Sequence, residues 1–200
     1  MASEATAIGV GASPGELELV VRLQRADQAA YAEFCRLFGP SLHGYVAIRL
    51  DGDDELAEEV VVQSLADAVR NIRRFNPRKA ALASWVYGIA RRQVVGERRR
   101  LNRRKSVPPS AQVPIEEALD LAEAGDMASD LISRVDARRK AACLSQVLSD
   151  LELEVLVLHC VDEFSLRVIG GIVGRSEKAV DSVLHRARQK ARERLARDGE

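Results

Sequence analysis

Aromatic side chains are scarce in this 200-residue chain, which has one Trp, three Tyr and four Phe. Large aromatics usually dominate sandwich cores and sugar-binding clefts, so neither is favoured here. The chain also shows no strand-like alternation of polar and apolar residues. Apolar residues make up 46% of it, and Ala, Leu, Val, Arg and Glu dominate. This composition favours helices, and we predict a globular all-α protein.

Residues that hold metals or perform covalent chemistry are sparse and scattered. Cys35, Cys143 and Cys160 have no C-x-x-C spacing, which indicates buried thiols in a reducing compartment. The three histidines are far apart, and the His159-Cys160 pair alone does not make a zinc site. We find no paired general acid and base, no phosphate-cradling glycine loop and no nucleophile constellation. We therefore predict no enzyme activity, no catalytic residue, no metal and no cofactor.

Long apolar runs are absent as well. The N-terminal stretch MASEATAIGVGASPGELELV lacks the basic start and the apolar segment of a signal peptide. No run approaches the ~18 apolar residues that a membrane-spanning helix needs. We therefore expect a cytoplasmic protein with no membrane insertion.

The formal net charge is zero, with 30 basic and 30 acidic residues, but the charges are unevenly placed. Residues 91–105 hold eight basic residues and one acid, and residues 167–197 hold nine basic residues and three acids. Acids dominate residues 51–59 and 116–136. A solvated helix face would explain any one block. Because both basic blocks end apolar helical patterns, we favour contact with nucleic acid.

Apolar residues recur at helical spacing from residue 16 onward. Gly39-Pro40 should interrupt the first run. Asp53 or Asp54, in the turn DGDD, can cap a later helix. Pro77 should separate that helix from the next one. The helices expected after the first interruption cover about 42–50, 55–72 and 82–104.

The composition then divides the chain into two parts. Residues 106–114 contain three prolines and no core pattern, which is typical of a linker. A second helical set begins near residue 130, with apolar stripes over about 141–151 and 155–159. We predict two small helical domains joined by a flexible acidic linker. The predicted limits are 1–24 for an N-terminal extension and the start of the first helix, 25–105 for the first domain, 106–135 for the linker and 136–200 for the second domain.

Residues 165–194 have the layout of a helix-turn-helix motif. Ser165 can cap a short first helix, Gly174 suits a turn that needs positive φ, and Ser176 can cap the second helix. The inward face of the second helix is predicted to hold Ala179, Val180, Val183, Leu184 and Ala187. The first turns of such a helix enter the major groove of DNA, and its later cations meet phosphate. An ordinary antiparallel helix pair with a basic surface is the alternative.

Two segments resemble bacterial sigma factors of the extracytoplasmic-function type. The segment from AYAEFCRLFGPSLHGYV to SWVYGIARRQVVGERRR resembles their region two. The segment LSDLELEVLVLHCVDEFSLRVIGGIVGRSEKAVDSVLHRARQKARERL resembles their region four. The most specific runs are Trp-apolar-Tyr-x-Ile-Ala-Arg and Val-x-Ser-x-apolar-His-Arg-Ala-Arg, and the two matches cover roughly residues 27–105 and 144–195 in the right order. The chain departs from the family pattern at several positions, among them Val62, Leu65, Val69, Arg92 and Gly96.

The resemblance implies a subunit that binds RNA polymerase core and directs it to promoters. Region two would pack on the clamp helices of the polymerase through one face of its third helix, at Glu58, Glu59, Gln63 and Asp67. For those residues a merely solvated face is the alternative. Region two would also hold the minus-ten element and capture a base flipped from the non-template strand. For the flipped base the resemblance implies Asn76, Arg78, Lys79 and Ser84. For the upstream phosphates of the minus-ten element it implies Arg91, Arg92, Arg98, Arg99 and Arg100.

Region four would read the minus-thirty-five duplex with one face and sit on the polymerase flap with the other. The residues implied to contact that duplex are Ser176, Lys178, Ser182, His185, Arg186 and Arg188. Sigma factors of this type are commonly held by an anti-sigma protein. The resemblance therefore implies three partners, namely polymerase core, promoter DNA and an anti-sigma factor.

Two other functions fit parts of the pattern. A stand-alone helix-turn-helix regulator, with an N-terminal domain that dimerises or senses a ligand, would bind duplex DNA tightly without polymerase. A helical interaction protein would show no affinity for nucleic acid. Association with core polymerase and promoter opening distinguish a sigma factor from both.

Overall fold

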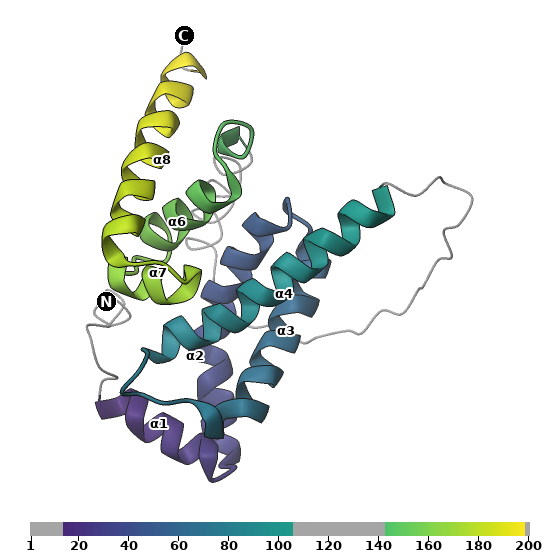
Figure 1. Cartoon of the computed structure of the whole chain (residues 1–200). Helices are drawn as coiled ribbons and strands as arrows, with labels where there is room; N and C mark the ends of the chain where they lie inside the picture. Colours follow the sequence, from purple (N-terminus) through teal and green to yellow (C-terminus); the bar gives the residue numbers. More distant parts are fainter. Residues whose placement is uncertain (1–13, 106–142, 199–200) are drawn as a thin grey trace.

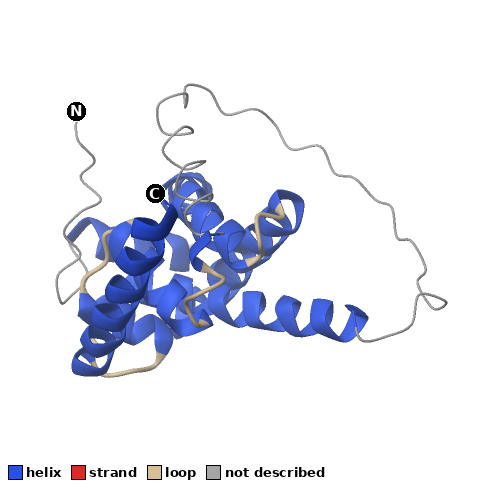
Figure 2. Ribbon diagram, turned by 90° about the horizontal axis from the view of Figure 1, so that it is seen from above, coloured by secondary structure: helices blue, strands red, loops and turns tan. Residues whose placement is uncertain are grey.

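The computed structural model describes residues 14–105 and 143–198, and every regular element in these two ranges is a helix (Figures 1 and 2). The helices are α1 (Pro14–Gln24), α2 (Gln28–Arg49), α3 (Asp54–Asn71), the short 3-10 helix η1 (Ile72–Arg74), α4 (Leu82–Lys105), α6 (Asp150–Cys160), α7 (Leu166–Val173) and α8 (Glu177–Asp198). The prediction of an all-α fold with two helical domains is confirmed. The predicted linker at 106–135 lies outside the described residues.

An N-terminal unit is formed by α1 to α4, which pack around apolar side chains. Asp27 begins α2, because its carboxylate accepts hydrogen bonds from the backbone N–H groups of Ala29 and Ala30. Asp53 begins α3 in the same way, accepting from the N–H of Leu56 at 3.0 Å, so one of the two predicted caps is confirmed. The buried face of α2 includes Phe34, Phe38, Leu42, Tyr45 and Val46, and α1 adds Leu19, Val20 and Leu23.

Helix α2 runs without a break through Gly39 and Pro40, so the predicted interruption there is wrong. A proline inside a helix removes one backbone donor and normally costs about 3 kcal/mol. Here Phe38 and Leu42 continue one buried face on both sides of Pro40, whose own ring is exposed. Burial of a long apolar stripe outweighs the local cost, so tertiary packing sets the length of this helix.

A C-terminal unit is formed by α6, α7 and α8, and it contains the predicted helix-turn-helix. Ser165 caps α7 by accepting a hydrogen bond from the N–H of Val168. Gly174 ends α7 in the left-handed region, with φ at 70°. Ser176 Oγ accepts from the N–H of Ala179 at 3.3 Å and so caps α8. All three turn and cap predictions are confirmed.

Helix α6 begins at Asp150, inside a stretch that the apolar pattern predicted to be one continuous helix. The chain turns at residues 145–148, in the middle of the expected stripe over 141–151. Ser149 and Glu152 then form a capping box, in which the Ser149 N–H donates to Glu152 Oε2 at 2.9 Å and Ser149 Oγ accepts from the Glu152 N–H. The box satisfies the backbone donors of a new helix start, which apolar periodicity alone does not report.

The two units touch each other, because α6 packs on α2 and α7 packs on α4 (Figure 1). The buried apolar residues of both units form one continuous cluster. At the boundary, the ring of Tyr87 in α4 meets the ring of Phe164 edge-on, with centroids 4.9 Å apart. The ring of Tyr45 in α2 also packs on Tyr87, with centroids 5.2 Å apart. The two domains that we predicted therefore share an interface that the sequence did not predict.

The cysteines differ from the expectation. Cys35 and Cys160 are exposed, so the prediction of buried thiols is wrong at these two positions. Cys35 follows Phe34, which faces the core, and the helical turn carries the thiol to the outer side of α2. Within residues 14–105 and 143–198, no group of three or more His, Cys, Asp or Glu side chains could hold a metal ion. Among the helices in those same ranges, none has the length and apolar character needed to cross a membrane.

Candidate nucleic-acid interface

The outward face of α8 carries the residues predicted to contact duplex DNA. Ser182 Oγ donates to the carbonyl of Lys178 at 3.0 Å, one turn earlier in the helix. Val180, Val183 and Leu184 face the interior, as expected. The exposed residues of the predicted set are Ser176, Lys178, Ser182, His185, Arg186 and Arg188. Helix α8 therefore presents a polar and cationic face from its first turn, which suits entry into a major groove.

Five of the residues predicted for the minus-ten element are open to solvent. Asn76, Arg78 and Lys79 lie in the loop before α4, where Asn76 Oδ1 accepts from the N–H of Arg78 at 2.9 Å. Arg92 and Arg99 are exposed on α4 itself. At about 1.5 Å per residue, Arg99 lies about 26 Å along α4 from its first residue. The loop and the distal arginine are therefore too far apart to contact the same nucleotide.

Ser84 and Arg100 are already engaged inside the protein. Ser84 is buried, and its hydroxyl donates to the carbonyl of Val168 in α7 at 3.0 Å. Arg100 forms an ion pair with Glu97, one turn earlier on α4. The structure therefore places Ser84 in the boundary between the two units and away from the exposed loop that precedes it.

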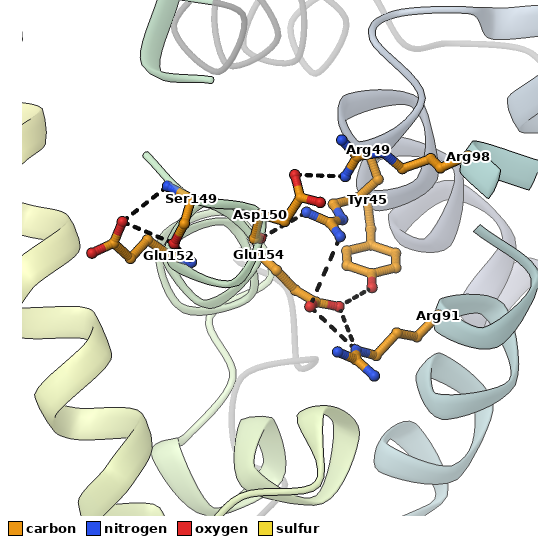
Figure 3. A network of polar contacts seen from close by, with 8 residues as sticks. All are labelled: Tyr45, Arg49, Arg91, Arg98, Ser149, Asp150, Glu152 and Glu154. Atoms are coloured by element: carbon orange, nitrogen blue, oxygen red, sulfur yellow. Dashed lines mark hydrogen bonds and ion pairs between the residues drawn. The ribbon is translucent and has the colours of Figure 1, made fainter. Parts of the chain in front are cut away.

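Arg91 and Arg98 form ion pairs with α6 of the C-terminal unit (Figure 3). Arg91 Nε lies 3.0 Å from Glu154 Oε1, and Arg98 Nη1 lies 2.7 Å from Asp150 Oδ1. Both arginines lie in the basic later part of α4, whose first turns are buried in the core. In this arrangement of the units, two arginines that were predicted to contact promoter phosphates are paired with carboxylates.

A groove of about 500 Å³ lies between α3 and α4. Trp85, whose ring is 5.4 Å from that of Phe75, forms part of its wall. Arg92 is the one predicted minus-ten residue in the lining of this groove. Asn71, Arg74 and Gln93 also line it and were not predicted as site residues. The lining consists of Asp67, Asn71, Arg74, Trp85, Ile89, Arg92 and Gln93. Asn71 ends α3 and Arg74 ends η1, and both line the groove. Their position at the end of an apolar helical pattern is the sequence feature that could have indicated them.

The residues predicted to contact polymerase divide into two sets. Glu58, Glu59 and Gln63 are exposed on the outer face of α3. Between them lies Val62, an apolar side chain that is 51% exposed. Asp67 instead turns toward α4, where its carboxylate accepts from Gln93 Nε2 at 2.7 Å. The outer face therefore combines acids, an amide and one apolar side chain, and Asp67 belongs to the groove.

Among the ionisable groups near the boundary, Glu152 and Tyr45 have clearly shifted pKa values. Burial opposes ionisation of Glu152, but hydrogen bonds from Lys190 and Ser149 outweigh it and lower its pKa to about 2. Burial raises the pKa of Tyr45 well above its ordinary value, and the charge of Glu154 beside it adds to that effect. At neutral pH, Glu152 is therefore an anion and Tyr45 is a neutral hydrogen-bond donor.

The fold is that of a helical protein with two units, the second of which contains a helix-turn-helix. The N-terminal unit matches the family model of Sigma-70 region 2 over residues 38–104, and the C-terminal unit matches that of Sigma-70, region 4 over residues 138–190. The chain belongs to the sigma-70 family, and it is a sigma factor of the extracytoplasmic-function type. Sigma factors bind RNA polymerase core and direct it to promoters, and their families are not enzyme families.

Solved structures show the same fold. The chain is similar to CnrH, from a structure of CnrH in complex with the cytosolic domain of CnrY. The identity is 20%, the TM-score is 0.62, and the match covers 90% of this chain and 97% of that one. It is also similar to the sigma factor RpoE in complex with the anti-sigma factor NepR from Bartonella quintana, with 22% identity, a TM-score of 0.58 and coverage of 83% and 96%. No curated protein gives a significant match.

Proposed function

We propose that the minus-ten strand of the promoter follows the groove between α3 and α4, and that the minus-thirty-five duplex meets the outer face of α8. The observation that carries this proposal is the placement of exposed cations on two different units. Arg92 and Arg99 belong to the first unit, and Lys178 and Arg188 belong to the second. Two separate cationic surfaces suit two separate DNA elements, because each phosphate contact releases counterions wherever it forms.

The lining of the groove has the chemistry of a single-strand site. Trp85 and Ile89 offer apolar surface, and an aromatic face supports a base by stacking. Arg74 and Arg92 supply cations for the backbone. Gln93 supplies an amide beside them, which accepts a hydrogen bond from Ser64 Oγ and donates one to Asp67. With a volume of about 500 Å³, this groove is large enough for an unpaired base.

Replacement of Arg92 tests the groove. We expect Arg92→Ala to weaken promoter opening by roughly fivefold, because an exposed phosphate contact contributes about 1 kcal/mol. Permanganate reactivity of unpaired thymines, measured with core polymerase present, reports the opening. Arg36→Ala removes an exposed arginine from α2, which does not line the groove, and should leave the signal unchanged. Equal permanganate reactivity with the two variants would contradict the proposal that the minus-ten strand follows this groove.

We also propose that the outer face of α3 contacts the clamp helices of the polymerase. Glu58, Glu59 and Gln63 offer charge and hydrogen bonds to a partly basic partner, and Val62 adds apolar surface. Glu59→Lys should weaken co-elution with core polymerase, because like charges then face each other. Glu18→Lys makes the same charge change on the exposed side of α1 and serves as the control. Equal co-elution of the two variants would argue against this face.

In the C-terminal unit, we assign the early residues of α8 to bases and the later cations to phosphate. Ser176, Lys178 and Ser182 lie in its cap and first turns, where a recognition helix meets base edges. His185, Arg186 and Arg188 follow one or two turns later. The opposite side of the unit would then sit on the polymerase flap.

We propose that the protein acts in the cytoplasm and is held there by an anti-sigma factor. Its target, promoter DNA bound by polymerase, is found in that compartment in bacteria. The similar RpoE structure is a complex with the anti-sigma factor NepR, and the similar CnrH structure is a complex with the cytosolic domain of CnrY. We propose no covalent chemistry for the chain.

A further inference from the structure

Helix α6 carries acids at every second position, namely Asp150, Glu152 and Glu154. Successive residues of a helix turn by about 100°, so residues 150 and 154 point in similar directions and residue 152 points away from them. Asp150 and Glu154 accordingly face cations of the N-terminal unit. Glu152 faces α8, where Lys190 Nζ donates to its carboxylate at 2.9 Å. One helix thus neutralises cations of both DNA-binding helices.

Glu154 is the centre of the contact between the units, and only 1% of it is exposed. Its Oε1 accepts from the hydroxyl of Tyr45 at 2.6 Å and from Arg91 Nε at 3.0 Å. Arg49 Nη2 lies 4.0 Å from Oε2, and Arg49 Nη1 donates to the carbonyl of Asp150 at 2.8 Å. Figure 3 shows these side chains converging on Glu154 from α2 and α4. Three N-terminal side chains therefore hold one buried carboxylate of the other unit.

The start of α4 is also covered by the C-terminal unit. A Cβ atom added to Gly171 of α7 would lie 2.9 Å from Ser84 Oγ and 3.2 Å from Ser84 Cβ. The two helices are therefore packed with no room for a methyl group at this point. The hydrogen bond from Ser84 to the carbonyl of Val168 lies at the same contact. Ser84, which is covered here, is one of the residues predicted for the minus-ten element.

We propose that α6 is an internal substitute for promoter phosphate, and that Glu154 and Asp150 latch the two units in a closed form that binds the minus-ten element less well than an open form does. In this form Arg91 and Arg98 are paired with carboxylates and Ser84 is buried. The inference rests on the proposed function, because Arg91 and Arg98 lie on α4 with Arg92 and Arg99, which that function assigns to promoter DNA. It adds a regulatory step that belongs to the chain itself, with no second protein required.

The balance of charges makes the latch reversible. A buried ion pair gains Coulomb attraction but loses the hydration of both ions, so its net stabilisation is small. When the units separate, Glu154, Arg49 and Arg91 all regain water, and Arg91 becomes available for phosphate. Binding energy from DNA or polymerase then needs to exceed only the difference between the two forms. Such a latch changes the fraction of chains in the open form without unfolding either unit.

Two variants of the full chain test the latch through different chemistry. Glu154→Gln removes the charge that faces Arg49 and Arg91 while keeping an acceptor for Tyr45. Gly171→Ala adds a methyl group against Ser84 and changes no charge. Matched controls are Glu163→Gln, at an exposed acid in the turn before α7, and Gly39→Ala, where an added Cβ meets nothing within 4 Å.

Small-angle X-ray scattering measures whether the units separate, and fluorescence anisotropy with a mixed-sequence single-stranded oligonucleotide measures whether cations become available. We expect both test variants to have a larger radius of gyration than the wild type, with helical content unchanged. We expect oligonucleotide affinity to rise by up to about tenfold, because apparent affinity scales with the fraction of open chains. The controls should match the wild type.

An unchanged radius and unchanged oligonucleotide affinity in both test variants would overturn the latch. The scattering readout needs neither polymerase nor a promoter. Expansion of the test variants with no response to core polymerase would therefore support the latch and contradict the proposed function. Normal promoter recruitment by test variants that do not expand would contradict the latch and support the proposed function.

Discussion

Glu152 and Glu154 are two residues apart in α6, yet they have different partners. Glu152 is bound to Ser149 and Lys190 within its own unit, whereas Glu154 is bound to Tyr45 and Arg91 of the other unit. The first therefore contributes to the stability of the C-terminal unit. The second contributes to the closed arrangement of the two units.

The pKa of Glu152 leads to a prediction about acid stability. Because the folded pKa, about 2, lies below the ordinary value, the carboxylate stabilises the fold above roughly pH 5, and this contribution is lost as pH falls toward 2. Glu152→Gln should lower the free energy of unfolding by about 1–3 kcal/mol at pH 7, since water screens the half-exposed Lys190. The difference from wild type should shrink below pH 4. Urea unfolding at several pH values checks this, and a difference that stays constant with pH would contradict it.

Gly174 gives a second prediction at the level of one residue. Its φ of 70° lies in the left-handed region, and an added Cβ would meet nothing within 4 Å. The cost of Gly174→Ala is therefore one of backbone conformation alone, and we expect a loss of about 1 kcal/mol in the free energy of unfolding. Gly174→Asn should cost less, because Asn tolerates this conformation better. Thermal unfolding compares the two variants, and equal losses would count against this explanation.

The sequence predicted residues of this kind well, because their roles are local. Asp53, Ser165, Gly174 and Ser176 act on backbone groups within a few positions of themselves, so their residue types alone indicate the role. The partners of Arg91 are different, because Glu154 is distant in the chain and reaches it only through the packing of the units. No local pattern reports such a contact.

At the scale of elements, α4 combines two functions along one helix. Its first turns are core, with Leu82, Val86 and Ile89 buried, and its last turns carry arginines. The sequence predicted both characters and the limits of the helix closely. It did not predict the groove that α4 forms with α3, because Asn71, Arg74 and Gln93 come together only when the two helices pack.

The arginines at the end of α4 give a prediction on salt dependence. Replacing Arg98, Arg99 and Arg100 together by Ala should weaken promoter complexes and reduce the salt slope by about 2–3, since each phosphate contact contributes about 0.9 to it. Filter binding of the polymerase–promoter complex over a range of salt measures the slope. Arg36→Ala should leave it unchanged. An unaltered slope in the triple variant would rule out a phosphate role.

Proline shows where element-scale prediction failed. Pro40 was expected to end a helix, but α2 continues because its apolar face does not stop there. The stripe over 141–151 failed in the opposite way, since the capping box at Ser149 and Glu152 begins a new helix inside it. Apolar periodicity reports which face is buried, and local hydrogen bonding decides where a helix starts.

At the scale of the whole molecule, the two helical domains could be predicted and their arrangement could not. Each domain has its own periodicity and turn signals, which the sequence displays. The interface is made of residues such as Tyr87, Phe164 and Gly171 that would suit an ordinary core equally well. Two domains that share a core in one form and bind separated DNA elements in another need an interface of this balanced kind.

The most direct test of the account is transcription in vitro with purified core polymerase and genomic DNA fragments, with and without this chain, followed by mapping of the transcript starts. We predict transcripts that begin at discrete positions only when the chain is present. Starts that are the same in both reactions, from a chain that does not join the polymerase, would contradict its assignment as a promoter-directing subunit.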